Sequence, residues 1–220
     1  MTTTFPGAPK TLSSGLILID PQTAAIQRII ILQYNPDMLM RSVQPQTLTG
    51  DVGDRLEALR FKAPAIETIK VEAEIDAADQ LEFPDQNPNA VTYGILPQLA
   101  ALEMMLYPSS VAVQQANALA QQGTIEIAAM ESMLTLFVWT QYRVLPVRVT
   151  EYSTTEEFFD ANLNPIRAKV NLGMRVLSSW DLGPTHTGAS IFAAYHQMKE
   201  TLVTKGPMGT LGALGLRRLP

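Results

Sequence analysis

The sequence contains no cysteine and only two histidines among its 220 residues. Disulfides, thiolate nucleophiles and cysteine-ligated metals are therefore excluded, and the lack of cysteine is compatible with assembly in a reducing cytoplasm. His186 and His196 lie ten residues apart and lack the i, i+4 spacing of a metal-binding pair on one helix. We interpret them as surface or helix-face residues.

Charge and aromatic side chains are also scarce, at 17% and 7% of the chain. Globular proteins usually carry about a quarter charged residues, so the shortage hints that other subunits cover part of the surface. A net charge of −5 without a basic patch argues against nucleic acid as a partner. No apolar run approaches the roughly 18 residues of a membrane span, and residues 1–14 lack the apolar core of a signal peptide.

Motifs for catalysis are missing as well. The chain has no phosphate-binding glycine loop, dinucleotide fingerprint, zinc-protease helix or serine nucleophile elbow. We interpret Glu156 and Glu157 as solvated charges at a hairpin tip, and Asp51, Asp54 and Glu57 as a solvated loop rather than a cation site. We expect no enzyme activity, no catalytic residue, no cofactor and no metal.

The pattern of apolar residues favours strands in groups over strict alternation with helices. We expect strands at 16–19, 26–34, 38–46, 68–76, 124–128, 134–140, 143–152 and 166–176, and helices at 97–106, 111–122 and 190–205. Turn chemistry at Asn35-Pro36-Asp37 makes 26–34 and 38–46 look like a hairpin. Residues 47–65, 77–89 and 154–164 are interpreted as connections and turns.

Grouped strands predict an α+β fold, an antiparallel β-barrel or sandwich with a central helix and a C-terminal helix. Residues 1–14 are interpreted as a flexible leader, 15–205 as the barrel domain and 206–220 as a tail. Trp139 and the Met104-Met105 pair are expected in the core.

Two segments alternate apolar and charged residues so regularly that each predicts a strand with one apolar and one charged face. The charged positions are Lys70, Glu72, Glu74 and Asp76 in the first segment, and Arg167, Lys169 and Arg175 in the second. Each face is either an exposed sheet surface or a surface that meets a channel or a neighbouring subunit. Stripes of opposite sign can also pair across a sheet or between protomers.

Five stretches, in order along the chain, resemble the tube-protein family of contractile injection systems. They are residues 30–37 continuing through Leu39 and Arg41, 65–69 with Glu72, Glu74 and Asp76, 94–108, 143–148 followed by Glu151, and 163–168 with Val170 and Leu172. Leu32 stands where phenylalanine is common in the opening motif of that family.

The resemblance implies a tail-tube type barrel whose long strands join neighbouring protomers in a ring. It further implies a non-enzymatic adaptor in a homo-hexameric ring, which initiates the inner tube and contacts the spike or hub trimer, the next tube ring, and baseplate or sheath components. Such a protein is cytoplasmic during assembly and then part of a large particle, released or membrane-docked. Longer relatives carry a C-terminal LysM module, and we expect none in residues 206–220.

The resemblance and the charge stripes together select the candidate interface residues. The segment from Tyr34 to Arg41 is the candidate contact between layers, and the charged stripes are candidates for a lumen or a protomer contact. The candidate residues are Tyr34, Asn35, Pro36, Arg41, Lys70, Glu72, Glu74, Arg167, Lys169 and Arg175.

Two alternatives stay open. The first is the repeating shaft subunit of the tube, which differs from an adaptor in copy number. The second is a cell-wall or carbohydrate-binding module at the particle tip, which predicts clusters of exposed aromatic side chains.

Overall fold

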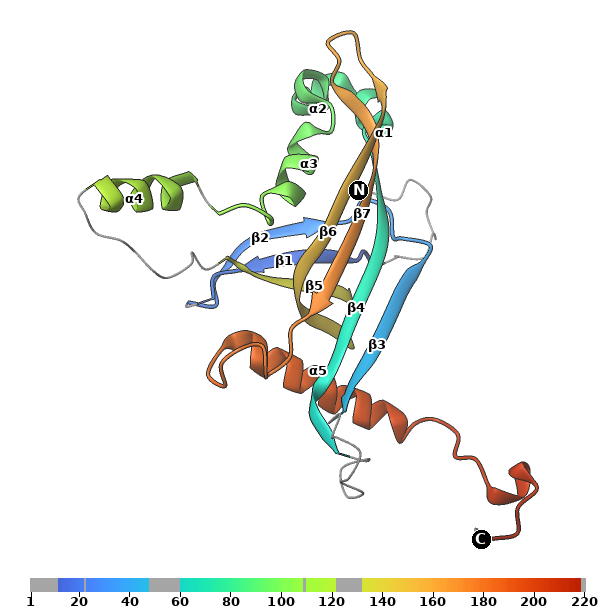
Figure 1. Cartoon of the computed structure of the whole chain (residues 1–220). Coiled ribbons are helices and arrows are strands. Elements are labelled where there is room, and N and C mark those ends of the chain that lie inside the picture. Colours follow the sequence, from blue (N-terminus) through green and yellow to red (C-terminus); the bar gives the residue numbers. More distant parts are fainter. Residues whose placement is uncertain (1–11, 22, 48–59, 109, 122–131, 219–220) are drawn as a thin grey trace.

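The computed structural model describes residues 12–21, 23–47, 60–108, 110–121 and 132–218. These residues form an α+β fold around one antiparallel sheet of seven strands in the order β2-β1-β5-β6-β7-β4-β3 (Figure 1). The strands are β1 (Gly15–Ile19), β2 (Ile26–Ile31), β3 (Leu39–Thr47), β4 (Phe61–Asp76), β5 (Leu134–Thr140), β6 (Arg143–Phe159) and β7 (Pro165–Val176). The helices are α1 (Ala78–Leu81), α2 (Pro88–Tyr93), α3 (Leu96–Glu103), α4 (Ser110–Gln121) and α5 (Thr187–Val203), with short 3-10 turns η1 (Pro84–Gln86) and η2 (Leu211–Leu214).

The sheet bends around its longest strand, β6. The first residues of β6 pair with β5 and the remainder pairs with β7, and Val147 takes part in both ladders. The two halves of the bent sheet therefore face each other across a single main core. Leu16 and Phe137 from one half meet Ile69 and Leu172 from the other, while α3 contributes Leu99 and Leu102.

The sheet does not close into a barrel. β2 and β3 form its two ends, and within the described residues neither strand pairs with a second neighbour. The expected hairpin of segments 26–34 and 38–46 is therefore wrong, because β2 pairs with β1 and β3 pairs with β4.

Hydrogen bonds explain why the link between these strands crosses the molecule instead of turning back. The side chain of Gln33 donates to the backbone oxygen of Asp76 (2.6 Å) and accepts from its backbone N–H (3.0 Å). Asn35 accepts from the backbone N–H of Ser14 (2.8 Å) and donates to the carbonyl of Leu12 (2.7 Å). These hydrogen bonds fasten the link to the end of β4 and to the residues just before β1, so the chain passes from one edge of the sheet to the other.

The strictly alternating strands are confirmed. In β4, Ile69, Val71, Ala73 and Ile75 are buried, and β7 buries every second residue from Ala168 to Val176. β5 has apolar side chains buried on both faces, as expected from its unbroken apolar run. One face joins the main core, and the other forms a smaller cluster with Ile19 and Ile191 of α5.

Other expectations need correction. Residues 77–89 are not a loop, because α1, η1 and the start of α2 lie there. Residues 154–159 extend β6, so Glu156 and Glu157 are strand residues opposite Ala168 and Arg167 rather than tip residues. Residues 61–65 belong to β4. The leader segment 1–11, the expected strand 124–128 and the acidic loop at 51–57 lie outside the described residues.

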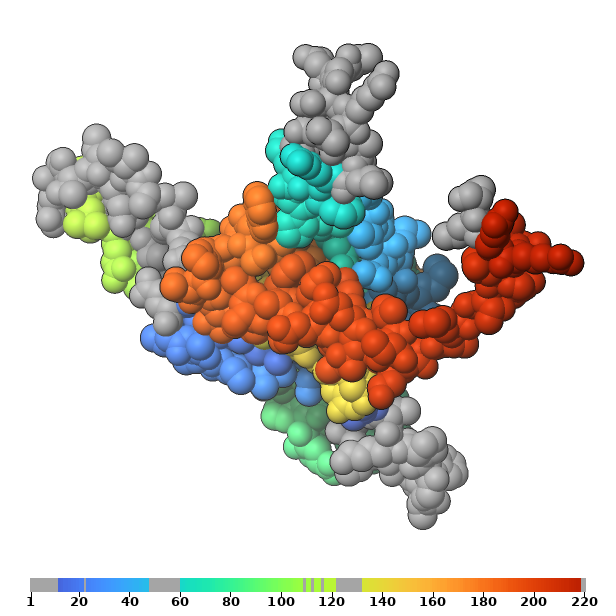
Figure 2. Space-filling model, turned by 90° about the horizontal axis from the view of Figure 1, so that it is seen from below, coloured from blue at the N-terminus to red at the C-terminus, as the bar shows by residue number. Residues whose placement is uncertain are grey.

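The expected core residues are confirmed in two of three cases. Met105 and Trp139 are half-buried against the main core, and the Trp139 ring lies 5.9 Å from that of Phe137. The expectation that Met104 lies in the core is wrong, since this residue is 52% exposed at the end of α3. α5 spans the underside of the sheet between the blue strands β1–β2 and the cyan start of β4, and the red C-terminal segment points away from the body (Figure 2).

Candidate assembly surfaces

The free edge at β2 is unusually apolar. Ile29 and Ile31 are 58% and 65% exposed, and Ile26 is exposed beside them. An edge strand presents unpaired backbone N–H and C=O groups, and monomeric proteins usually protect it with charges, proline or a covering segment. β2 carries only Arg28 as a charged residue. This edge is therefore suited to pairing with another strand.

The free edge at β3 lies at the other end of the same sheet. Met40 and Val43 are exposed on it, and Met38 is exposed just before it. Pro45 and one charged residue, Arg41, give this strand only partial protection. A single sheet thus ends in two different exposed edges.

The outer face of β4, β7 and β6 is charged and largely self-paired. Arg167 pairs with Glu74 of β4, and its Nε lies 3.9 Å from Oδ2 of Asp76. Lys169 stands opposite Glu74 in the β4–β7 register. Pairing of the two stripes across the sheet, one of the two expected arrangements, is thereby confirmed for Arg167.

Arg175 has a different role from the other two cations of its stripe. Its Nη2 donates to Oδ1 of Asp181 at 2.7 Å, and Asp181 also accepts from the backbone N–H and the hydroxyl of Ser178. Burial raises the pKa of Asp181, but the hydrogen bonds from Ser178 and the charge of Arg175 outweigh it and the net pKa is lowered. Arg175 therefore fastens the segment between β7 and α5.

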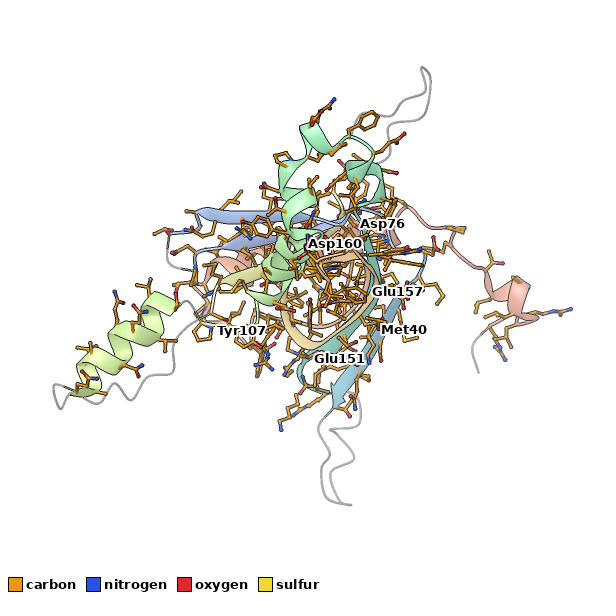
Figure 3. The ribbon with its side chains drawn as sticks, turned by 90° about the horizontal axis from the view of Figure 1, so that it is seen from above. Met40, Asp76, Tyr107, Glu151, Glu157 and Asp160 are labelled. Atoms are coloured by element: carbon orange, nitrogen blue, oxygen red, sulfur yellow. The ribbon has the colours of Figure 1, made fainter. Side chains whose placement is uncertain are left out.

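A groove of about 680 Å³ lies where the 32–38 link passes the charged face. It gathers six of the ten candidate residues: Tyr34, Asn35, Pro36, Lys70, Glu72 and Glu74. Met40 and Glu151 also line it, and both lie on the same side of the molecule in the view from above (Figure 3). Lys70 Nζ lies 2.6 Å from Glu151 Oε2 across this groove.

Arg41 lies outside the groove, in a network on the opposite side of the sheet. Its Nε donates to Oε1 of Glu67 at 2.5 Å, Lys199 of α5 donates to Oε2 at 3.1 Å, and the Tyr195 hydroxyl donates to Oε1 at 3.2 Å. Glu67 is only 4% exposed. Burial raises the pKa of Glu67, but the hydrogen bond from Arg41 and the charge of Lys199 outweigh it, so the net pKa lies below the ordinary value.

Glu67 is a buried, paired carboxylate that the sequence reasoning missed. Its position in the sequence could have revealed it, because Glu67 lies on the same face of β4 as the apolar residues Ile69, Val71 and Ala73. A charge at such a position must find a partner, since an unpaired buried charge is costly.

The histidines lie as expected. Nδ1 of His186 caps α5 by accepting from the N–H of Gly188 at 3.0 Å, and His196 stacks on Phe192 and lies 3.5 Å from Glu200. Within the described residues, no three His, Cys, Asp or Glu side chains form a cluster able to hold a metal. In the same part of the chain no helix has the length and hydropathy needed to cross a membrane.

A second hollow, of about 860 Å³, lies between α5 and the start of β4. Phe61, Trp180 and Phe192 line it, and Phe61 and Trp180 are largely exposed.

Comparisons with family models and with curated proteins returned no match for this chain.

Proposed function

We propose that this protein is a structural ring subunit of a phage-tail-like contractile injection system, with a tail-tube type fold, that joins the spike or hub to the inner tube and initiates tube assembly. The observation that carries the proposal is the open sheet with two different exposed edges, β2 and β3. The order of the five family-like sequence stretches supports the choice of machine.

The geometry supports a head-to-tail contact between identical copies. β2 of one protomer pairs with β3 of the next, and because the two surfaces differ, the contact is heterologous and repeats around a closed ring. Burying the half-exposed Ile29 and Ile31 contributes roughly 1 kcal/mol each, and the backbone pairing satisfies both edges. The charged face of β4, β6 and β7 then lines the lumen or a neighbouring layer, and the expected ring is a hexamer.

A charge placed on the β2 edge tests the contact. We expect the purified protein to assemble into rings seen by electron microscopy and light scattering, and the Ile29→Lys, Ile31→Lys variant to remain monomeric. Gln27→Lys is the matched control, since it adds a lysine to an already polar, exposed position of the same strand. Rings formed equally by the double variant, or a wild-type protein that stays monomeric at high concentration, would refute the proposal.

The absence of native cysteine allows the pairing to be mapped directly. We expect a chain carrying both Ile29→Cys and Ser42→Cys to give a ladder of oxidised multimers that ends at the ring size. Moving the second cysteine to Met40 or Gln44 covers neighbouring registers on β3. A ladder that stops at dimers, with Ile29→Cys alone sufficient, would indicate an isologous β2–β2 contact instead.

Adaptor and shaft subunit differ in copy number. The helices α4 and α5 and the C-terminal segment add surface beyond the sheet and favour an adaptor. Quantitative mass spectrometry of purified particles is expected to give one ring per particle. Many rings per particle would make the chain the shaft subunit.

One observation favours a second function, binding of cell-wall carbohydrate. The hollow between Phe61, Trp180 and Phe192 offers the aromatic surface on which sugar rings stack. Titration of the protein with peptidoglycan fragments, followed by tryptophan fluorescence and compared with Trp180→Ala, decides it. A signal that is absent, or unchanged in the variant, eliminates this function.

A further inference from the structure

The segment after α5 is basic and apolar. From Thr201 onward the sequence contains no acidic residue, and it carries Lys205, Arg217 and Arg218. Its 3-10 turn η2 (Leu211–Leu214) is capped by Thr210, whose hydroxyl accepts from the N–H of Ala213, and is followed by Gly215 with a φ of 71°. We define residues 206–218 as the tail.

The tail presents its apolar side chains to solvent. Leu211, Leu214 and Leu216 are exposed, and Met208 is almost fully exposed. In Figures 1 and 2 the tail extends away from the sheet. Exposed leucines held by a capped turn form a short apolar motif that the other described residues leave largely uncovered.

The groove beside the 32–38 link has the opposite character. Its lining includes four carboxylates, on Asp37, Glu72, Glu74 and Glu151, and one ammonium, on Lys70. Within the described residues, Asp37 and Glu72 make no ion pair.

Further features of the groove suit an apolar and basic segment. Met38, Met40 and Tyr34 add an apolar rim. Burial and the negative charges of Asp79 and Asp76 raise the pKa of Tyr34, which is the effect expected of a negative local potential.

The direction in which the tail leaves α5 favours the groove of a neighbouring copy over the groove of its own chain. α5 lies against the first half of β4, where Lys199 bonds Glu67, whereas the groove begins at Lys70 and extends past Glu72 toward the other end of that strand. The tail leaves α5 on the opposite side of the molecule from α1, which follows the end of β4 (Figure 1). The seven residues from Thr204 to Thr210 can span about 23 Å when extended, so η2 can lie well beyond the end of α5.

We propose that the groove of each copy receives the C-terminal tail of a second copy of this chain. The leucines of η2 pack on Met38 and Met40, and the guanidinium groups of Arg217 and Arg218 bond the carboxylates of Glu72 and Asp37. Arginine suits this contact because its planar donors match carboxylates. The contact touches Met40 on the outer face of β3 but needs no backbone group of either free edge, so it can be tested in a variant that lacks β2–β3 pairing.

Mixed cysteine variants test whether the contact is between copies. Protein with Met40→Cys is mixed with protein carrying Leu214→Cys and oxidised under mild conditions. We expect a disulfide-linked heterodimer, with at least tenfold less product when Gln141→Cys, at the exposed β5–β6 turn, replaces Met40→Cys. No heterodimer in the mixture, or a disulfide formed only within one chain carrying both cysteines, overturns the proposal.

Charge reversal tests the chemistry of the contact. In the Ile29→Lys, Ile31→Lys background, which removes pairing at β2, Arg217→Glu with Arg218→Glu is expected to lower the heterodimer yield at least tenfold, as is Asp37→Lys with Glu72→Lys. Combining the two reversals in opposite partners is expected to restore the yield, and salt is expected to weaken the wild-type contact. The proposed contact is contradicted if neither charge reversal changes the heterodimer yield, or if combining the two does not restore it.

Discussion

At the scale of single residues, Glu67 shows how a charge is tolerated in the interior of this fold. The carboxylate has three donors, one each from Arg41, Tyr195 and Lys199, and they come from β3 and α5. Lys199 also lies 4.1 Å above the Tyr195 ring. The network therefore fastens α5 to the sheet, and the position of the tail depends on it.

Glu67→Gln is expected to destabilise the protein by about 2 kcal/mol, because hydrogen bonds to a charged group are lost and two cations lose their partner. Arg41 and Lys199 are each about a third exposed and can rehydrate, which limits the loss. Urea unfolding followed by circular dichroism measures it. The control is Glu200→Gln, which removes an exposed acid next to Lys199 on α5. It should change the free energy of unfolding by less than about 0.5 kcal/mol.

The carboxylate of Glu67 is also expected to make the stability of the folded chain depend on pH in the acid range. Its pKa in the native chain lies below the ordinary value of 4.5, so the unfolded chain binds the proton first as the pH falls. The stabilisation is complete above about pH 4.5 and is lost as the pH falls through the depressed native pKa. Melting temperatures of wild type should therefore fall more steeply over this interval than those of Glu67→Gln. If the melting temperatures of the two proteins fell in parallel with pH, Glu67 would not be a source of the acid sensitivity.

The sequence carries a signal for only one member of this network, and the sequence analysis did not use it. The parity of Glu67 within β4 marks it as an inward charge, but nothing local identifies its partners. Lys199 is 132 positions away, and its approach depends on how α5 crosses the sheet.

At the scale of elements, the contact of the α2–α3 corner with the β6–β7 hairpin depends on one glycine. Gly94 has a φ of +57°, and a Cβ there would lie 2.2 Å from the carbonyl oxygen of Pro165. The N–H of Ile95 donates to that same oxygen at 2.9 Å. The corner is thus pressed against the start of β7.

Gly94→Ala is expected to cost about 2 kcal/mol or more, since it combines a strained φ with a backbone clash. Thermal unfolding checks this, with Gly209→Ala as the control because no atom lies within 4 Å of its added methyl group. A melting temperature equal to that of the control would show that the corner yields without cost.

Elements with strict periodicity were predictable, and their partners were not. Alternation fixed the faces of β4 and β7 because burial on one face leaves a period of two in the sequence. The short helices α1 and α2 were missed because Pro84 and Pro88 resemble loop residues, although Pro88 lies in the first turn of α2, where proline is tolerated. The false hairpin arose because Asn35 favours a turn locally but bonds Ser14 instead.

At the scale of the whole molecule, the main difference between expectation and structure is that the sheet stays open. The resemblance implied a barrel, and a single chain forms a bent sheet with β2 and β3 as its ends. Sequence patterns report burial within one chain and carry no direct signal for edges that a second chain covers. The exposed isoleucines of β2 are the residues that a neighbouring copy would cover in the proposed ring.

If a second copy covers these edges, stability must depend on protein concentration. Association that occurs only between folded chains stabilises them by mass action, so the melting temperature rises as the protein is concentrated. We expect this rise for wild type and for Gln27→Lys, and a concentration-independent melting temperature for Ile29→Lys, Ile31→Lys. Scanning calorimetry over a hundredfold range of concentration measures it. A wild-type melting temperature that stays constant over that range would mean that the β2 and β3 edges remain uncovered in solution, which contradicts ring formation by this chain.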